Sequence, residues 1–246
     1  MKASIPRFCF ATATCLVLST WTATAQDVIV QKDGQLREGE ITGVKPDAIR
    51  IKIGPAETAV PLANVQTVRK AAPTDFDAAN SLWQSGNAAE ALAKLEPLAQ
   101  KFSGLPTPWA ERASSMLPEL YIALGRTSDA ETSFQNFQKF YPKAGSSSEL
   151  LLARLAVAKK DLSTARARLE PLVQAAKQTK LPAGAEAVTM SQALCLMGEV
   201  QQQTGEKPEA LENYLLVTTL FKNDPASLSR AAIRAEALQK EKVIVP

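Results

Sequence analysis

The segment Gly205-Glu206-Lys207-Pro208-Glu209-Ala210-Leu211 is one of four related copies that decide the fold. In each copy a turn residue is followed five positions later by alanine, and the copies at 86–92, 125–131, 160–166 and 205–211 begin 39, 35 and 45 residues apart. Apolar residues follow each alanine at positions +4 and +7, which is the spacing of one helical face. Repetition of such a unit predicts a stack of helix pairs. The apolar residues are Leu95, Leu98, Phe134, Phe137, Leu169, Leu172, Tyr214 and Val217.

The four copies resemble tetratricopeptide repeats. In that family a glycine turn joins two antiparallel helices, a small alanine lies where they cross, an aromatic residue follows four positions later, and a proline closes the unit. The third copy departs from the pattern because Lys160 replaces the turn glycine, and the first copy lacks the closing proline. The second and fourth copies match best, at Gly125, Ala130, Phe134 and Tyr141-Pro142, and at Gly198, Gly205, Ala210 and Tyr214.

This resemblance implies a mainly α fold, an α-solenoid of helix hairpins over residues 74–242. The hairpins are expected at about 74–104, 107–143, 146–180 and 183–223, with a capping helix at 225–242. Thr107-Pro108 and Asp224-Pro225 each supply an N-cap residue followed by proline at the first helical position. Pro118 lies inside a helical pattern and is expected to kink or split that helix.

Residues 26–70 have a different pattern, with a period of two and frequent turn residues. The stretch 48–53 alternates strictly, which places Ile49, Ile51 and Ile53 on one face. Asp33-Gly34 predicts a tight turn. Five short strands are predicted, at 27–31, 35–43, 48–53, 58–62 and 64–68. Closure of these strands into a small barrel would remove their exposed edges.

This module resembles the SH3-like and Sm-like small β-barrels. The resemblance rests on Asp33-Gly34, Gly39-x-Ile41, the isoleucine strand and Pro61-Leu62-x-x-Val65. Members of these families bind RNA, bind peptides or assemble into rings. The module has 7 basic and 6 acidic residues and no aromatic residue, which argues against nucleic acid binding. Docking or oligomerisation is therefore expected of it, and residues 71–73 are expected to link it to the helices.

Residues 1–25 have the pattern of a signal peptide. Lys2 and Arg7 are followed by an uncharged segment from Phe8 to Trp21, and then by Ala23-Thr24-Ala25. Such a segment predicts that the protein is exported, to the periplasm or out of the cell, with cleavage after Ala25. Cleavage would lower the formal net charge from +3 to +1, because two basic residues leave. Retention of the segment as a membrane anchor is the alternative.

The composition excludes several kinds of enzyme. The chain has no histidine, so a histidine-based triad and an HExxH zinc site are impossible. No phosphate-binding glycine loop is present, and one cysteine, Cys195, remains after cleavage. Cys195 lies in an apolar run and is interpreted as a core residue rather than a nucleophile. We expect no catalytic site, metal or cofactor, although an unrecognised site built from carboxylates stays possible.

The resemblance to tetratricopeptide repeats implies a concave groove lined by the first helix of each pair. The basic and amide residues with which some family members hold a peptide carboxylate are not reproduced, and a mixed apolar and polar groove remains. Trp83 and Trp109 either pack between repeats or anchor a partner. The predicted partner-binding residues are Asn80, Trp83, Arg112, Glu119, Arg154, Gln192 and Glu199.

The sequence therefore predicts a non-enzymatic scaffold or adaptor of the bacterial cell envelope. Its groove is expected to hold a protein or peptide partner, and a membrane would be reached only through such partners. The alternative is a structural homo-oligomeric platform assembled through the N-terminal β-barrel.

Overall fold

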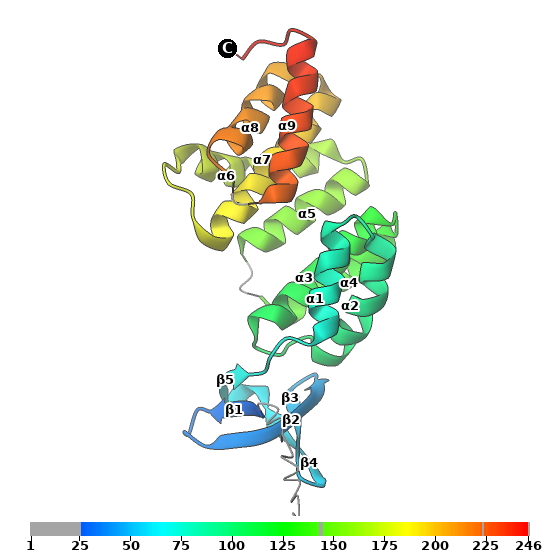
Figure 1. Ribbon diagram of the computed structural model, residues 1–246, viewed down its shortest axis with the longest axis vertical. Coiled ribbons are helices and arrows are strands. Elements are labelled where there is room, and N and C mark those ends of the chain that lie inside the picture. Colours follow the sequence, from blue (N-terminus) through cyan, green and yellow to red (C-terminus); the bar gives the residue numbers. More distant parts are fainter. Residues whose placement is uncertain (1–25, 143–144, 223, 246) are drawn as a thin grey trace, which may run out of the picture.

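The computed structural model describes residues 26–142, 145–222 and 224–245. Within this part the chain is mainly α-helical, with a small antiparallel sheet at one end of an elongated molecule (Figure 1). The predicted signal peptide, residues 1–25, lies outside the described residues. The helices are α1 (Thr74–Gln84), α2 (Ala88–Phe102), α3 (Pro108–Ala123), α4 (Thr127–Phe140), α5 (Ser146–Ala158), α6 (Leu162–Gln178), α7 (Gly184–Thr204), α8 (Lys207–Thr219) and α9 (Pro225–Lys240).

The sheet contains the five predicted strands in the order β4-β3-β2-β1-β5. Ile49 and Ile51 are fully buried, as their alternation predicts, but Ile53 at the end of its strand is 38% exposed. No hydrogen-bonded pairing joins β4 to β5 among the described residues, so the pairings leave two edges where barrel closure was expected to leave none. The strands are β1 (Asp27–Gln31), β2 (Leu36–Lys45), β3 (Ala48–Ile53), β4 (Ala56–Pro61) and β5 (Val65–Arg69), with a 3-10 helix at Leu62–Asn64.

The first eight helices form four hairpins with the same turn. In each turn the residue before the second helix donates its backbone N–H to a carbonyl five residues back, at 2.8–2.9 Å. The four alanines of the repeated segment are fully buried, because the paired helices approach closely there. These donors are Asn87, Arg126, Asp161 and Glu206, and the alanines are Ala91, Ala130, Ala165 and Ala210.

Successive hairpins stack on one another. The second helix of each hairpin contacts the first helix of the next, and α3, α5, α7 and α9 are neighbours in that order. Two apolar cores result, and α5 belongs to both: Leu151 and Leu155 face the core of α1–α4, whereas Leu150 and Ala153 face the core of α5–α9. The final helix α9 covers α7 and α8 with Ala231, Ala235 and Leu238.

Three prolines lie inside helices, and none of them ends its helix. Pro118 is buried within α3, which runs unbroken from Pro108 to Ala123, so of the two expected outcomes, a kink or a split, the split does not occur. Pro97 and Pro171 occupy equivalent places in α2 and α6. The residues four positions before these two prolines are exposed, so water can satisfy the carbonyls that lose a helical donor.

The two predicted N-cap residues occupy the cap positions but do not cap with their side chains. The Thr107 hydroxyl is buried and has no hydrogen-bond partner among the described residues. The Asp224 carboxylate instead accepts hydrogen bonds from the Ser227 hydroxyl at 2.7 Å and from the Gln192 amide at 3.0 Å. The cap position could thus be predicted from the sequence, but not the hydrogen bonds of its side chain.

The sheet and the helices share a core across the stretch 70–73. Phe102, Leu105 and Trp109 pack into the cluster formed by the isoleucines of the sheet. The indole Nε1 of Trp109 donates to the carbonyl of Lys70 at 3.0 Å. The predicted linker is therefore short and lies beside a packed interface, so the sheet is not a separate hydrophobic unit.

Lys160 takes the left-handed conformation that glycine takes in the other three turns. Its φ is +63°, compared with +87° for Gly86, +71° for Gly125 and +87° for Gly205. We predict that Lys160→Gly raises the free energy of unfolding by about 0.5–1 kcal/mol, because relief of the left-handed strain exceeds the entropy that glycine adds to the unfolded chain. Urea unfolding would measure this change. The control Lys159→Gly, at a φ of −84°, should lower stability, and equal effects of the two variants would contradict the explanation.

Candidate functional site

A cavity of about 380 Å³ lies among the first helices of the second, third and fourth hairpins. Residues spaced three or four apart on α3, α5 and α7 form its walls, because such spacing gathers side chains on one helical face. Its apolar side consists of Phe137 of α4, Leu150 and Leu151 of α5, and Val188 of α7, and its charged or amide side chains are Glu111, Arg112, Glu119 and Gln192.

Three of the seven predicted partner-binding residues line this cavity. Arg112 and Glu119 lie two turns apart on α3 and form an ion pair with 3.4 Å between guanidinium Nη1 and carboxylate Oε1. The Glu119 side chain is only 10% exposed, whereas that of Arg112 is 44% exposed. Gln192 reaches the cavity from α7. The predicted face of these helices therefore borders a real cavity.

Arg154 and Gln192 belong to a hydrogen-bonded chain that joins α5, α7 and α9. Arg154 donates to Oε1 of Gln192 at 3.2 Å, and the Gln192 amide donates to Asp224 at 3.0 Å. Ser227 completes the chain on the same carboxylate. Gln192 accepts from Arg154 and donates to Asp224, so this chain orients Gln192 in the wall of the cavity. The buried Nε of Arg154 has no partner among the described residues.

Glu199 lies further along α7, outside the cavity. Its carboxylate is 3.5 Å from the guanidinium of Arg230 on α9. Cys195 lies one turn before Glu199 and is 2% exposed within the core of α5–α9, which confirms the interpretation of this cysteine as a core residue. Burial, with a smaller contribution from the charge of Glu199, raises the pKa of the Cys195 thiol to about 12.

The raised pKa of Cys195 predicts a loss of stability in alkali. An unfolded thiol ionises near 9, whereas the folded protein retains the proton until about 12. The unfolded chain therefore binds fewer protons in this interval, and the free energy of unfolding should fall as the pH rises from 9 to 12. Urea unfolding at pH 8, 9.5 and 11 should show a shallower fall for Cys195→Ala than for the wild type. Parallel curves for the two proteins would refute this.

The remaining two predicted residues, Asn80 and Trp83, are on α1 and do not line the cavity. Trp83 is half-buried against the core of α1–α4. Trp109 is 8% exposed and packs beside Phe76 and Phe102, with ring centroids 6.2 and 5.4 Å away. Because Trp109 is buried, it is not available to anchor a partner. Its neighbours belong to the sheet as well as to the helices.

The sequence prediction missed several cavity residues on the same three helices, each closer to the helix N-terminus than the predicted residues. Glu111, Ser147 and Val188 continue the predicted faces of α3, α5 and α7 by steps of three or four residues. Extending each face toward its first turn would have found them. Asp224 and Arg230 were missed because α9 was interpreted only as a cap, although it follows α3, α5 and α7 in the same series.

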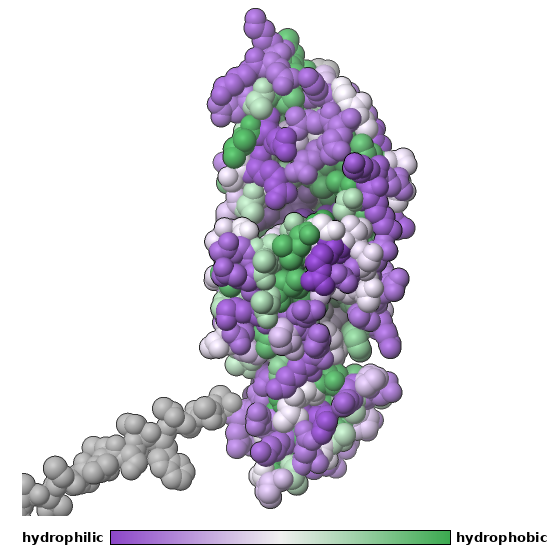
Figure 2. Space-filling model, turned by 90° about the vertical axis from the view of Figure 1, so that its right-hand side faces the viewer, coloured by the Kyte–Doolittle hydropathy of each residue, from purple (hydrophilic) through white to green (hydrophobic). Residues whose placement is uncertain are grey.

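A second, larger cavity of about 580 Å³ lies between the end of β2 and helices α2, α3 and α4. Tyr121 at its inner wall donates to Glu96 at 2.7 Å, and burial raises the pKa of Tyr121 to about 12. None of the seven predicted residues lines this cavity. Figure 2 shows one face of the molecule, on which hydrophobic and hydrophilic residues are interspersed without one continuous apolar surface.

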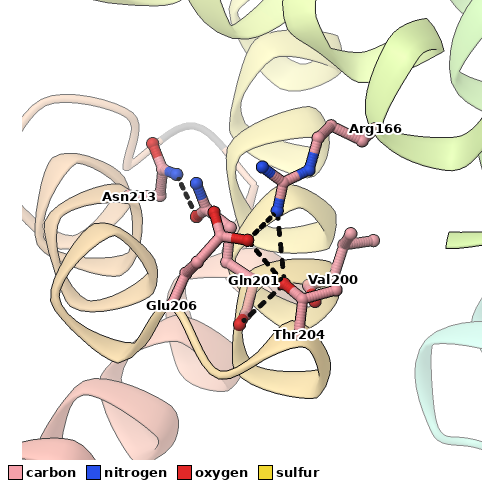
Figure 3. Close-up of polar contacts among 6 residues, drawn as sticks. All are labelled: Arg166, Val200, Gln201, Thr204, Glu206 and Asn213. Carbon is pink, nitrogen blue, oxygen red and sulfur yellow. Dashed lines mark hydrogen bonds and ion pairs between the residues drawn. The ribbon is translucent and has the colours of Figure 1, made fainter. Parts of the chain in front are cut away.

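A group of polar contacts joins the third and fourth hairpins and is structural. Arg166 of α6 contacts both the Thr204 hydroxyl and the Glu206 carboxylate at the turn before α8 (Figure 3). Nearby, Asn213 donates to Gln201 at 2.7 Å. The hydrogen bond from Arg166 lowers the pKa of Glu206. Because Arg166, Thr204 and Glu206 satisfy one another, we assign these three to the stacking of hairpins and not to binding.

The described residues contain neither a candidate metal-binding cluster nor a helix able to cross a membrane. No cluster of three or more cysteine, aspartate or glutamate side chains with metal-binding geometry occurs within residues 26–142, 145–222 and 224–245. None of the helices in that part of the chain combines the length and the apolar character needed to cross a bilayer. Comparison of the chain with protein-family models, with curated proteins and with solved structures finds no match.

Proposed function

We propose that this protein is an exported scaffold or adaptor of the bacterial cell envelope. Residues 74–242 would form a tetratricopeptide-like array that binds a partner protein or peptide on the face of α3, α5 and α7. The observation that supports this proposal is the cavity of about 380 Å³, which three successive first helices border with both apolar and charged side chains. Such mixed concave surfaces suit an extended segment or a helix.

The proposal is tested by crosslinking native cells that contain the tagged protein and identifying the captured envelope proteins by mass spectrometry. Val188→Arg places a long charged side chain in the cavity and should abolish capture of a groove-bound partner. Gln174→Arg, at an exposed position of α6, is the matched control and should leave capture unchanged. The proposal is refuted if every protein captured by the wild type is captured equally by Val188→Arg and Gln174→Arg.

Export is a separate part of the proposal. It rests on Lys2, Arg7 and the sequence Ala23-Thr24-Ala25. Amino-terminal sequencing of the mature protein from periplasmic and membrane fractions should give Gln26 as the first residue. An intact amino terminus in the membrane fraction would instead establish a retained anchor.

A homo-oligomeric platform is the second candidate function, because β4 and β5 leave two sheet edges unpaired among the described residues. Five of the six β4 residues are exposed, and exposed strand edges can pair with another chain. Light scattering of the complete mature chain would report its mass, and Thr58→Lys on β4 should dissociate an edge-paired oligomer. A monomer at all concentrations would remove this candidate.

A further inference from the structure

The cavity on α3, α5 and α7 has an excess of negative charge. Glu111 and Glu119 face it from α3, and Arg112 is the one basic residue among its described lining. The Glu119 side chain is nine-tenths buried, and its contact with Arg112 involves only Oε1, at 3.4 Å. Among the described residues no hydrogen bond to the other oxygen, Oε2, is found. A buried carboxylate with a free oxygen favours a ligand that brings a hydrogen-bond donor or a positive charge.

The cavity also has an apolar side. Phe137, Leu150, Leu151 and Val188 line it together with Glu119, so a group large enough to fill the cavity can contact aliphatic and aromatic side chains as well as this carboxylate. Arginine and lysine have this character, because an aliphatic stem carries the cation. A carboxylate would meet two acids in the cavity, and a wholly apolar group would leave Glu119 desolvated without a donor.

The neighbouring basic residue Arg154 does not reverse this charge preference. It is not among the residues that line the cavity, and it donates to Gln192, whose amide in turn donates to Asp224. Arg112 is largely exposed and contacts one oxygen of Glu119, which leaves room for a second cation on the other. We infer that the partner segment inserts an arginine or lysine side chain into this cavity and pairs it with Glu119. This inference rests on the proposed function.

The experiment is a selection of random 12-residue peptides displayed on phage against the complete mature chain. Peptides that bind the wild type but not the Val188→Arg variant bind at the cavity. We expect these peptides to share a basic residue. Replacing that residue by glutamine should weaken binding, measured by fluorescence anisotropy, by about tenfold or more, as expected for loss of a desolvated charge pair. Glu119→Gln should weaken binding of the parent peptide by a similar factor. Combining Glu119→Gln with the glutamine-substituted peptide should cause little further loss of affinity.

Two variants keep the result interpretable. Glu149→Gln is the matched control, because Glu149 pairs with Arg168 outside the cavity, and it should leave binding unchanged. Glu111 is exposed, so Glu111→Gln should leave folding unaffected. It should weaken peptide binding a few-fold, because one negative charge leaves the cavity. Cavity-dependent peptides that lack a basic residue, or that bind Glu119→Gln normally, would overturn the inference and leave the proposed function standing. If no peptide depends on the cavity, both are overturned.

Discussion

Trp109→Ala is expected to lower the free energy of unfolding by about 3–5 kcal/mol, the range for removing a large aromatic side chain from a core. Trp109 is 8% exposed and contacts the aromatic rings of Phe76 and Phe102. Its Nε1 also donates to the Lys70 carbonyl, next to the last strand. The substitution therefore removes packing and a hydrogen bond at the same interface between sheet and helices.

The position of Trp109 predicts which elements should lose most protection from hydrogen exchange when it is replaced by alanine. Hydrogen exchange should accelerate most in the strands and at the start of α3, because these elements share the cluster that Trp109 joins. Trp83→Ala is the matched control: this tryptophan is half-buried on α1, and its removal should cost clearly less. Equal losses for the two variants, or unchanged exchange in the sheet, would contradict a coupling role for Trp109.

Gly198→Ala is expected to destabilise the protein by about 1–3 kcal/mol through overpacking. Gly198 lies inside α7, where alanine would normally be the better helix former. A Cβ atom at this position would come within 2.6 Å of Cε1 of Tyr214, whose side chain is fully buried. The Tyr214 hydroxyl donates to Gln202 at 2.8 Å, so the ring has little freedom to move away.

The clash with the tyrosine ring can be isolated by a double-mutant cycle. Tyr214→Leu removes the ring, and in that background Gly198→Ala should become neutral or slightly stabilising, because only helix propensity remains. Denaturant unfolding of the four proteins gives the coupling energy. A cost for Gly198→Ala that is the same in both backgrounds would show that Tyr214 is not its cause.

The candidate site could be predicted from the sequence only in part. The groove implied by the resemblance to tetratricopeptide repeats led to Arg112, Glu119 and Gln192, which lie on the faces of α3 and α7 that border one cavity. The same reasoning included Asn80 and Trp83, which lie on α1 away from it. Periodicity within a helix identifies a shared face, but the distance between faces depends on how the hairpins stack.

The sequence by itself determined the elements of this protein. Alternation at 48–53 marked a strand, and the repeated turn residue and alanine marked four hairpins, because both patterns reflect local geometry with fixed periods. The mainly helical fold with a small sheet followed from these patterns. The split that was one of the two outcomes expected at Pro118 did not occur, since its helix is continuous.

Only the tertiary structure decided which elements share a core and which side chains satisfy each other. It joined the sheet to α2 and α3 through Trp109, buried Glu119 beside an apolar wall, and directed Asp224 to Gln192 in place of the helix terminus. These contacts join residues that lie 32–39 positions apart or belong to separate elements. Local periodicity carries no information about such distances, because they depend on the packing of whole hairpins against one another.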